Sequence, residues 1–243
     1  MERRPLSTLK KHLLILAVVT ILARGLVLIS YSNVIGRADE VASQYMASQL
    51  LHGNFLVGSL RYNFGYAFVM TPVVALTNIF GPLQPRIIIL VQSMLAGLIP
   101  FLIYDILRKR RSGTEALTVA LIAALDPFAL QWTQFFLPIW LLALCTVLAF
   151  WLIERSMSSP IWNLLWIALA GISLGIAALA RLEFALVAAA LGFALLFFKT
   201  SWPTRLKMFT IFGIGGGYWL FMSSLSTTHQ QTLGHYPVMA ALT

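Results

Sequence analysis

Charged side chains are scarce in this chain: they make up 10% of its 243 residues, whereas 59% of the residues are hydrophobic. A soluble domain usually carries about 25% charged residues. With a mean hydropathy of +0.85, the chain cannot bury its apolar surface in a core of its own, so lipid must cover much of it. The apolar runs lack the alternation of a β-barrel. We therefore predict an all-α, polytopic transmembrane helical bundle.

Cysteine and histidine are also scarce, which excludes two kinds of chemistry. The single cysteine, Cys145, cannot form an intramolecular disulfide, and its apolar surroundings in the sequence argue against thiol catalysis. The four histidines show no close spacing of the kind that zinc ligands have: His12, His52, His229 and His235.

Basic residues outnumber acidic ones and give a formal charge of +9. They stand at the ends of apolar runs, so they indicate membrane topology, and we expect no nucleic-acid partner. Arg24 is the exception, because it lies inside the first run, and we expect it to extend toward the membrane surface. That run, Leu13–Ser30, exceeds the length of about 7–15 residues of a signal-peptide core, which predicts a retained first transmembrane helix.

Eight hydrophobic runs are candidates for membrane helices. They are Leu13–Ser30, Phe64–Phe80, Ile87–Leu107, Ala116–Leu130, Phe135–Ile153, Trp162–Ala180, Leu182–Phe198 and Met208–Leu225. The run Ala116–Leu130 is short, but Glu115 and Gln131 can extend its ends. Within it, Asp126 stands directly before Pro127, which predicts a helix end at that point.

The distribution of basic residues decides which run does not cross. If Phe64–Phe80, which contains Pro72, lies on the outer surface, twelve basic residues fall inside and four outside. If it crosses, six fall inside and ten outside, which the positive-inside rule disfavours. We therefore predict a multi-pass cell-membrane protein with seven crossings, a cytoplasmic N-terminus, an external C-terminus and an external loop from Tyr31 to Pro85.

The predicted loop contains an amphipathic surface helix. Polar residues recur every four positions after Asp39, at Glu40, Gln44, Ser48 and His52. Apolar residues form the opposite face, at Val41, Ala42, Tyr45, Met46 and Leu50. This pattern suits a helix that lies on the membrane and ends at Gly53, with Phe64–Phe80 as a second, more buried surface segment.

Glycines at helix-packing spacing occur in two of the later runs. One pair is Gly171 and Gly175, and the other is Gly213 and Gly217. Small residues four apart let two membrane helices approach closely, so we expect both pairs to lie at helix contacts.

An acidic pair, Asp39-Glu40, is the strongest candidate for chemistry, because only eight residues of the chain are acidic. At the outer surface such a pair is suited to act as a base or to bind a divalent cation. A structural interpretation stays open: Asp39 can cap the surface helix, and Glu40 can favour its positive end.

The order of motifs along Leu13 to Leu225 resembles the GT-C superfamily of membrane glycosyltransferases, in particular the dolichyl-phosphate-mannose–protein mannosyltransferase and aminoarabinose-transferase type. After the acidic pair, the similar stretches are Gln49-Leu50-Leu51-His52-Gly53, Phe80-Gly81-Pro82, Gln84-Pro85-Arg86-Ile87-Ile88, Val91-Gln92-Ser93-Met94-Leu95-Ala96-Gly97, Ala124-Leu125-Asp126-Pro127 and Gly175-Ile176-Ala177-Ala178-Leu179-Ala180-Arg181-Leu182-Glu183. The resemblance implies that residues 1–243 form a single module, the seven-helix part that the family shares.

The resemblance also implies a polyprenyl-phosphate-linked sugar as donor and an acid of the first external loop as base or metal ligand. By position this acid is Asp39, with Glu40 beside it. The phosphate leaving group needs cations nearby, and the outer-side candidates are Arg37, Arg61, Arg86 and Arg181.

One departure from the family pattern keeps an alternative open. A second acidic residue is expected in the next external loop, and Ile139 stands at that position. The alternative is a truncated or degenerate, non-enzymatic module that binds polyprenyl lipid or partners another membrane subunit. A transporter ranks last, because only Arg24 resembles a midplane charge.

Overall fold

The computed structural model describes residues 6–29, 38–53, 64–77, 84–135, 137–158, 163–181, 183–197 and 201–232. These residues form helices, with no strand among them, which confirms the predicted all-α class. The helices are α1 (Leu6–Ile29), α2 (Ala38–Leu51), α3 (Phe64–Thr77), α4 (Gln84–Ala96), α5 (Leu98–Leu107), α6 (Gly113–Leu125), α7 (Pro127–Trp132), α8 (Ile139–Ser158), α9 (Asn163–Ala180), α10 (Phe184–Leu195) and α11 (Trp202–Thr232).

Four segments of the described chain are long and apolar enough to cross a membrane: Thr8–Ile29, Arg86–Leu107, Ile139–Ser158 and Asn163–Ala180. Shorter apolar helices lie at Gly65–Leu76, Gly113–Leu125 and Phe184–Leu195. This composition supports a helical membrane bundle. At 1.5 Å per residue, α6 spans only about 20 Å of a hydrocarbon core of about 30 Å, so the count of seven crossings stays a prediction.

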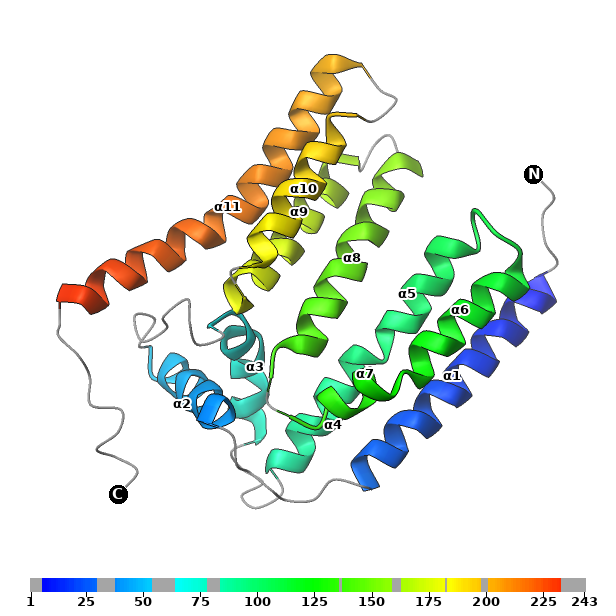
Figure 1. Cartoon of the computed structure of the whole chain (residues 1–243), viewed down its shortest axis with the longest axis horizontal. Coiled ribbons are helices and arrows are strands. Elements are labelled where there is room, and N and C mark those ends of the chain that lie inside the picture. The colour runs from blue at the N-terminus through cyan, green and yellow to red at the C-terminus, as the bar shows by residue number, and fades with distance from the viewer. Residues whose placement is uncertain are drawn as a thin grey trace.

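The long helices run alternately between two ends of the bundle (Figure 1). One end, which we call the basic end, holds the turn after α5 with Arg108–Arg111 and the end of α8 with Arg155. The opposite end holds α2, α3 and α7, and we call it the loop end. The basic residues at this end are among those that the charge distribution assigned to the cytoplasmic side. The side of the membrane that the basic end faces stays a prediction.

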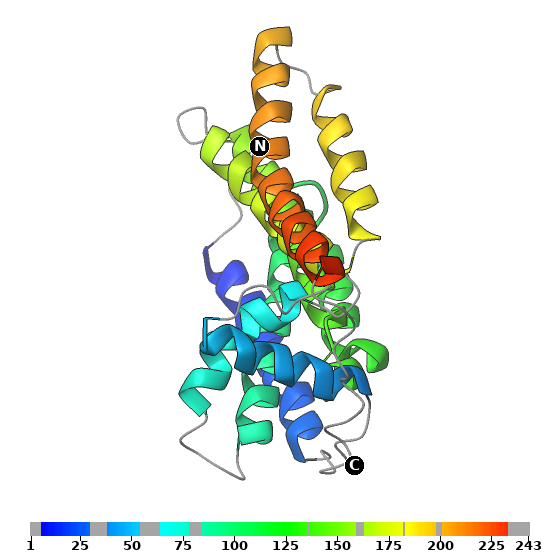
Figure 2. The same ribbon diagram turned by 90° about the vertical axis from the view of Figure 1, so that its left-hand side faces the viewer.

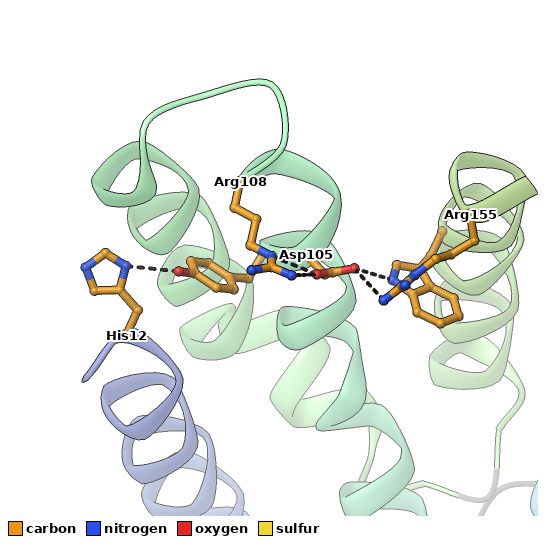
Figure 3. A network of polar contacts seen from close by, with 6 residues as sticks. His12, Asp105, Arg108 and Arg155 are labelled. Carbon is orange, nitrogen blue, oxygen red and sulfur yellow. Dashed lines mark hydrogen bonds and ion pairs between the residues drawn. The ribbon is translucent and has the colours of Figure 1, made fainter. Parts of the chain in front are cut away.

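A network of polar contacts joins helices at the basic end (Figure 3). The Asp105 carboxylate lies 2.6 Å from Nη2 of Arg108 and 3.6 Å from Nη2 of Arg155. The Tyr104 hydroxyl and Nδ1 of His12 lie 3.0 Å apart. These contacts bring α1, α5 and α8 together.

Helix α2 lies across the direction of the long helices (Figure 2) and packs on α3. Its buried side chains follow the spacing of one helix face: Ser43, Met46, Ala47 and Leu50. Tyr45, predicted on the apolar face, is 52% exposed, because it lies beside this stripe and not within it. Gly53 has φ = 78° and ends the helix as predicted, with its N–H donating to the Leu50 carbonyl across 3.1 Å.

The predicted run Ala116–Leu130 divides into two helices. Helix α6 ends at Leu125 and α7 begins at Pro127, so extension to Gln131 was wrong, whereas a helix end at Asp126-Pro127 is confirmed. Oδ1 of Asp126 accepts the N–H of Phe128 across 3.0 Å and caps α7. The chain therefore turns at the loop end before it enters α8.

Glycines set the close packing of α9 against α11 and α3. A methyl group on Gly171 would overlap the carbonyl oxygen of Phe212. On α11 the close contact is made by Gly215, whose added Cβ would lie 2.8 Å from the Ala168 carbonyl oxygen, whereas Gly213 and Gly217 face open space. The prediction for Gly213 and Gly217 was therefore wrong. Their spacing shows that they share one face of the helix, but it does not show which face packs against a neighbouring helix.

Candidate functional site at the loop end of the bundle

Asp39 and Glu40 occupy the second and third positions of α2. Asp39 therefore stands within the first turn of the helix and not in front of it, where a capping residue would stand. A carboxylate in the first turn still interacts favourably with the positive end of the helix dipole. The placement of these two side chains lies outside what the structure describes.

A chain of packed helices connects α2 to Arg181. Helix α2 packs on α3, and α3 approaches α9 so closely that a Cβ on Gly65 would lie 2.7 Å from the backbone nitrogen of Ala180. Arg181 follows directly and is exposed. The acidic pair and Arg181 therefore belong to the same end of the bundle.

The structure describes only some of the other arginines that were predicted to bind phosphate. Arg86 is exposed near the start of α4, at the loop end. Within the described part of the chain, neither Arg86 nor Arg181 forms an ion pair. Arg37 and Arg61 lie outside the described residues.

A buried polar network occupies the bundle core near this end. Tyr66 donates its hydroxyl to Oε1 of Gln92, which is 0% exposed. The amide nitrogen of Gln92 donates to the carbonyl oxygens of Thr133 and Phe135, at 3.2 Å each. Gln92 thus ties α3, α4 and the segment after α7 together, and both ends of its amide are satisfied.

Arg24 also belongs to this network. Its side chain is only 7% exposed, and Nη1 donates to Oγ1 of Thr133 across 3.1 Å. The expectation that Arg24 extends to the membrane surface was therefore wrong, because a hydroxyl partner and α7 cover it inside the bundle. A charged side chain held within a membrane bundle indicates a functional site.

Several buried polar atoms near this network have no hydrogen-bond partner among the described residues. They are Oγ1 of Thr20, Nε of Arg24, Oγ of Ser93 and Nε1 of Trp140. Burial of such groups without partners is costly. In the sequence, Gln92-Ser93 and Thr20 interrupt strongly apolar runs, but only the packing of the helices shows that these residues face inward together.

The position where the family resemblance implies a second acid carries an apolar residue. Ile139, at the position where the family resemblance implies an acid, is the first residue of α8. No group of three or more histidine, cysteine, aspartate or glutamate side chains that could hold a metal occurs among the described residues. Asp39 and Glu40 alone would fit a hard divalent cation only if substrate phosphate and water completed its coordination.

A shallow groove of about 470 Å³ opens beside the junction of α6 and α7. Its lining is mostly apolar: Thr118, Leu121, Ile122, Leu125, Asp126 and Pro127. Asp126 lines this groove, and its charge acts on Arg24 of the buried network.

A family model described as dolichyl-phosphate-mannose-protein mannosyltransferase matches residues 67–226, about two thirds of the chain. The match runs from α3 into α11 and includes Arg86, Gln92, Thr133 and Arg181, whereas α2 with Asp39 precedes it. Comparison with curated proteins and with solved structures yields no match. On the extent of the family match, the chain belongs to the dolichyl-phosphate-mannose-protein mannosyltransferase family of GT-C-type membrane glycosyltransferases.

Proposed function

We propose that this chain is an integral membrane glycosyltransferase that takes a sugar from a polyprenyl-phosphate-linked donor at the outer face of the membrane. The observation that carries the proposal is the family match over residues 67–226. The geometry of the loop end supports it, because an acidic pair at the start of α2, two exposed arginines and a buried arginine all belong to that end.

In this proposal Asp39 takes the proton from the acceptor hydroxyl as that oxygen attacks the anomeric carbon of the donor sugar. The bond between the sugar and the phosphate oxygen breaks, and the polyprenyl phosphate leaves with the bonding electrons. A positioned general base contributes about 10²–10⁴-fold to such a step. Arg86 and Arg181 offset the charge of the departing phosphate.

Glu40 has an auxiliary role, because it follows Asp39 at the start of the same helix. Two carboxylates in one helical turn increase the local negative charge, which favours transfer of the acceptor proton to Asp39. If a divalent cation takes part, these two residues would hold it, and it would supply charge compensation for the phosphate.

The test is the substitution Asp39→Asn, which preserves size but removes the negative charge. Transfer of sugar from a polyprenyl-phosphate donor should fall by about a hundredfold or more, while the protein still folds in detergent. Glu183→Gln is the matched control, since it removes an exposed carboxylate from the same end of the bundle. Equal activity in the Asp39→Asn variant and the wild type would remove Asp39 from the mechanism.

A second candidate is a non-enzymatic module that binds polyprenyl lipid or partners another membrane subunit. The presence of Ile139 at the start of α8, where the family resemblance implies an acid, favours it. It predicts a wild-type chain that binds polyprenyl phosphate but is inert toward a panel of lipid-linked sugars, even with a candidate partner subunit present.

A further inference from the structure

Three buried polar side chains with unpartnered atoms meet where α1 packs on α4. Oγ1 of Thr20, Nε of Arg24 and Oγ of Ser93 have no hydrogen-bond partner in the described part of the chain. Their residues are 6%, 7% and 1% exposed. Each atom is therefore withdrawn from bulk water without a described protein partner, and a bound group with hydrogen-bond acceptors would satisfy all three.

Helix geometry places the three side chains side by side. Thr20 and Arg24 are one turn apart on α1, and Ser93 and Gly97 are one turn apart on the antiparallel segment α4–α5. A Cβ on Gly97 would lie 3.3 Å from Cγ2 of Thr20, so Arg24, one turn further along, lies level with Ser93. Arg24 and Gln92 also donate to the same residue, Thr133, which fixes Arg24 beside this part of α4.

A group that fits beside these three side chains would be an anion. A guanidinium presents five N–H donors and no acceptor, and within the described residues Arg24 uses one nitrogen, Nη1, toward a neutral hydroxyl. The two hydroxyls add further donors. No carboxylate of the described chain lies within ion-pair distance of Arg24, although the charge of Asp126 reaches it.

We propose that Thr20, Arg24 and Ser93 form a buried subsite for the phosphate group of a polyprenyl phosphate, an inference that rests on the proposed function for the identity of the lipid. Asp126 is the carboxylate whose charge acts on Arg24, although the two side chains form no ion pair among the described residues. Its carboxylate caps α7 through Phe128, so it remains in place when the phosphate binds and opposes that binding by repulsion.

The groove beside α6 and α7 gives the lipid a place for its hydrocarbon chain. Its lining includes Leu121, Ile122 and Leu125, together with Asp126, whose charge acts on Arg24. An isoprenoid chain in the groove would therefore have its phosphate at the end of the bundle that contains Arg24.

The first experiment removes the two hydroxyls without touching the contact between Arg24 and Thr133. The double variant Thr20→Val/Ser93→Ala is compared with the wild type for binding of a short polyprenyl phosphate in nanodiscs, with inorganic phosphate and phosphatidylglycerol as parallel probes. Ser156→Ala is the matched control, because Ser156 is also buried but donates to the Ile153 carbonyl of its own helix. We expect the double variant to bind polyprenyl phosphate about tenfold or more weakly, and the control to bind as the wild type does.

The second experiment removes a positive charge in one variant and a negative charge in another. Arg24→Met should abolish binding while Thr133 keeps its hydrogen bond to the Leu130 carbonyl. Asp126→Asn retains the cap of α7 but removes the opposing charge, so it should strengthen binding. A structural role for Arg24 and Asp126 as a simple charge pair predicts the reverse for Asp126→Asn, namely weaker or unchanged binding together with lower thermal stability.

The outcomes separate the subsite from the proposed function. Binding that is unchanged in the double variant, or a wild type that binds none of the three probes, overturns the subsite. Equal binding of inorganic phosphate and polyprenyl phosphate overturns the assignment to a lipid. A wild type that binds polyprenyl phosphate through these residues but transfers no sugar retains the subsite and overturns the transferase.

Discussion

Trp151 donates its indole N–H to Oδ2 of Asp105 across 2.8 Å, and this bond joins α8 to α5 at the basic end. The other carboxylate oxygen of Asp105 accepts from Nε of Arg108 at 2.7 Å. The guanidinium of Arg155 lies over the Trp151 ring, 4.9 Å from its centroid. Asp105 is therefore the shared acceptor of the network in Figure 3, and its side chain is 18% exposed.

Removal of the Asp105 carboxylate should destabilise the bundle more than removal of an exposed ion pair. We expect Asp105→Ala to cost about 1–3 kcal/mol, because it leaves the Trp151 N–H and two guanidinium groups without their acceptor. A double-mutant cycle with Trp151→Phe, read from thermal unfolding in detergent, should give a coupling energy above about 0.5 kcal/mol.

The matched control for this cycle is the pair of Arg110 and Glu154. Its atoms lie 2.7 Å apart, but the Arg110 side chain is 63% exposed. Exposed pairs contribute about 0–1 kcal/mol, so Arg110→Gln should change stability little. Equal losses for Arg110→Gln and Asp105→Ala would mean that Asp105 does not organise the basic end.

Gly171 is a position of α9 where a side chain would overlap the neighbouring helix. Gly171→Ala would push a methyl group against the Phe212 carbonyl oxygen of α11, which the backbone cannot relieve by a rotamer change. We expect a loss of about 1–3 kcal/mol and a lower midpoint of thermal unfolding. Gly213→Ala is the control, since open space surrounds that position, and alanine should slightly favour the helix there.

If Gly213→Ala proves as damaging as Gly171→Ala, then α11 packs on α9 through a different face from the one described. If both are harmless, then the two helices are not in close contact in the folded protein. The two variants therefore test the packing arrangement as well as one glycine.

Local signals in the sequence predicted local structure well. The sequence Asp126-Pro127 predicted a helix end because proline lacks an N–H and restricts its predecessor, and α6 ends there. Gly53 predicted the end of α2 because glycine readily adopts positive φ. Apolar runs predicted most of the long helices, because a bilayer leaves the backbone few other structures.

Features that depend on helix rotation could not be predicted in the same way. Arg24 was expected at the surface because a long side chain in a span often extends there. Only the packing of α1 against α4 and α7 brings Thr133 within reach and covers the guanidinium. Likewise, a glycine pair identifies a face but not the neighbour, so the sequence could not distinguish Gly215 from Gly213.

The topology prediction can be tested with single cysteines. His52 lies just after α2 at the loop end and Ser112 just before α6 at the basic end, and both are exposed. In a Cys145→Ser background, a membrane-impermeant maleimide added to intact cells should label His52→Cys and not Ser112→Cys. Labelling of both positions from outside would overturn the assignment of the two ends to opposite sides.

Arg181 offers a test of how the outer face holds a phosphate. A guanidinium can hold phosphate by two parallel hydrogen bonds, and an ammonium group cannot reproduce this fork. Arg181→Lys should therefore weaken binding of a polyprenyl-phosphate analogue in nanodiscs while expression stays intact. Arg86→Lys is the comparison, because it makes the same change at the other exposed arginine of this end.

The fold should not confound the Arg181 experiment, because the turn between α9 and α10 is held by backbone bonds. The N–H of Arg181 donates to the Ala177 carbonyl across 2.9 Å, and its own carbonyl accepts from Phe184 across 3.0 Å. Lysine retains both bonds, so a loss of binding would report on the guanidinium itself. Unchanged binding would limit Arg181 to anchoring the turn at the membrane surface and leave the phosphate to Arg86 and the buried subsite around Arg24.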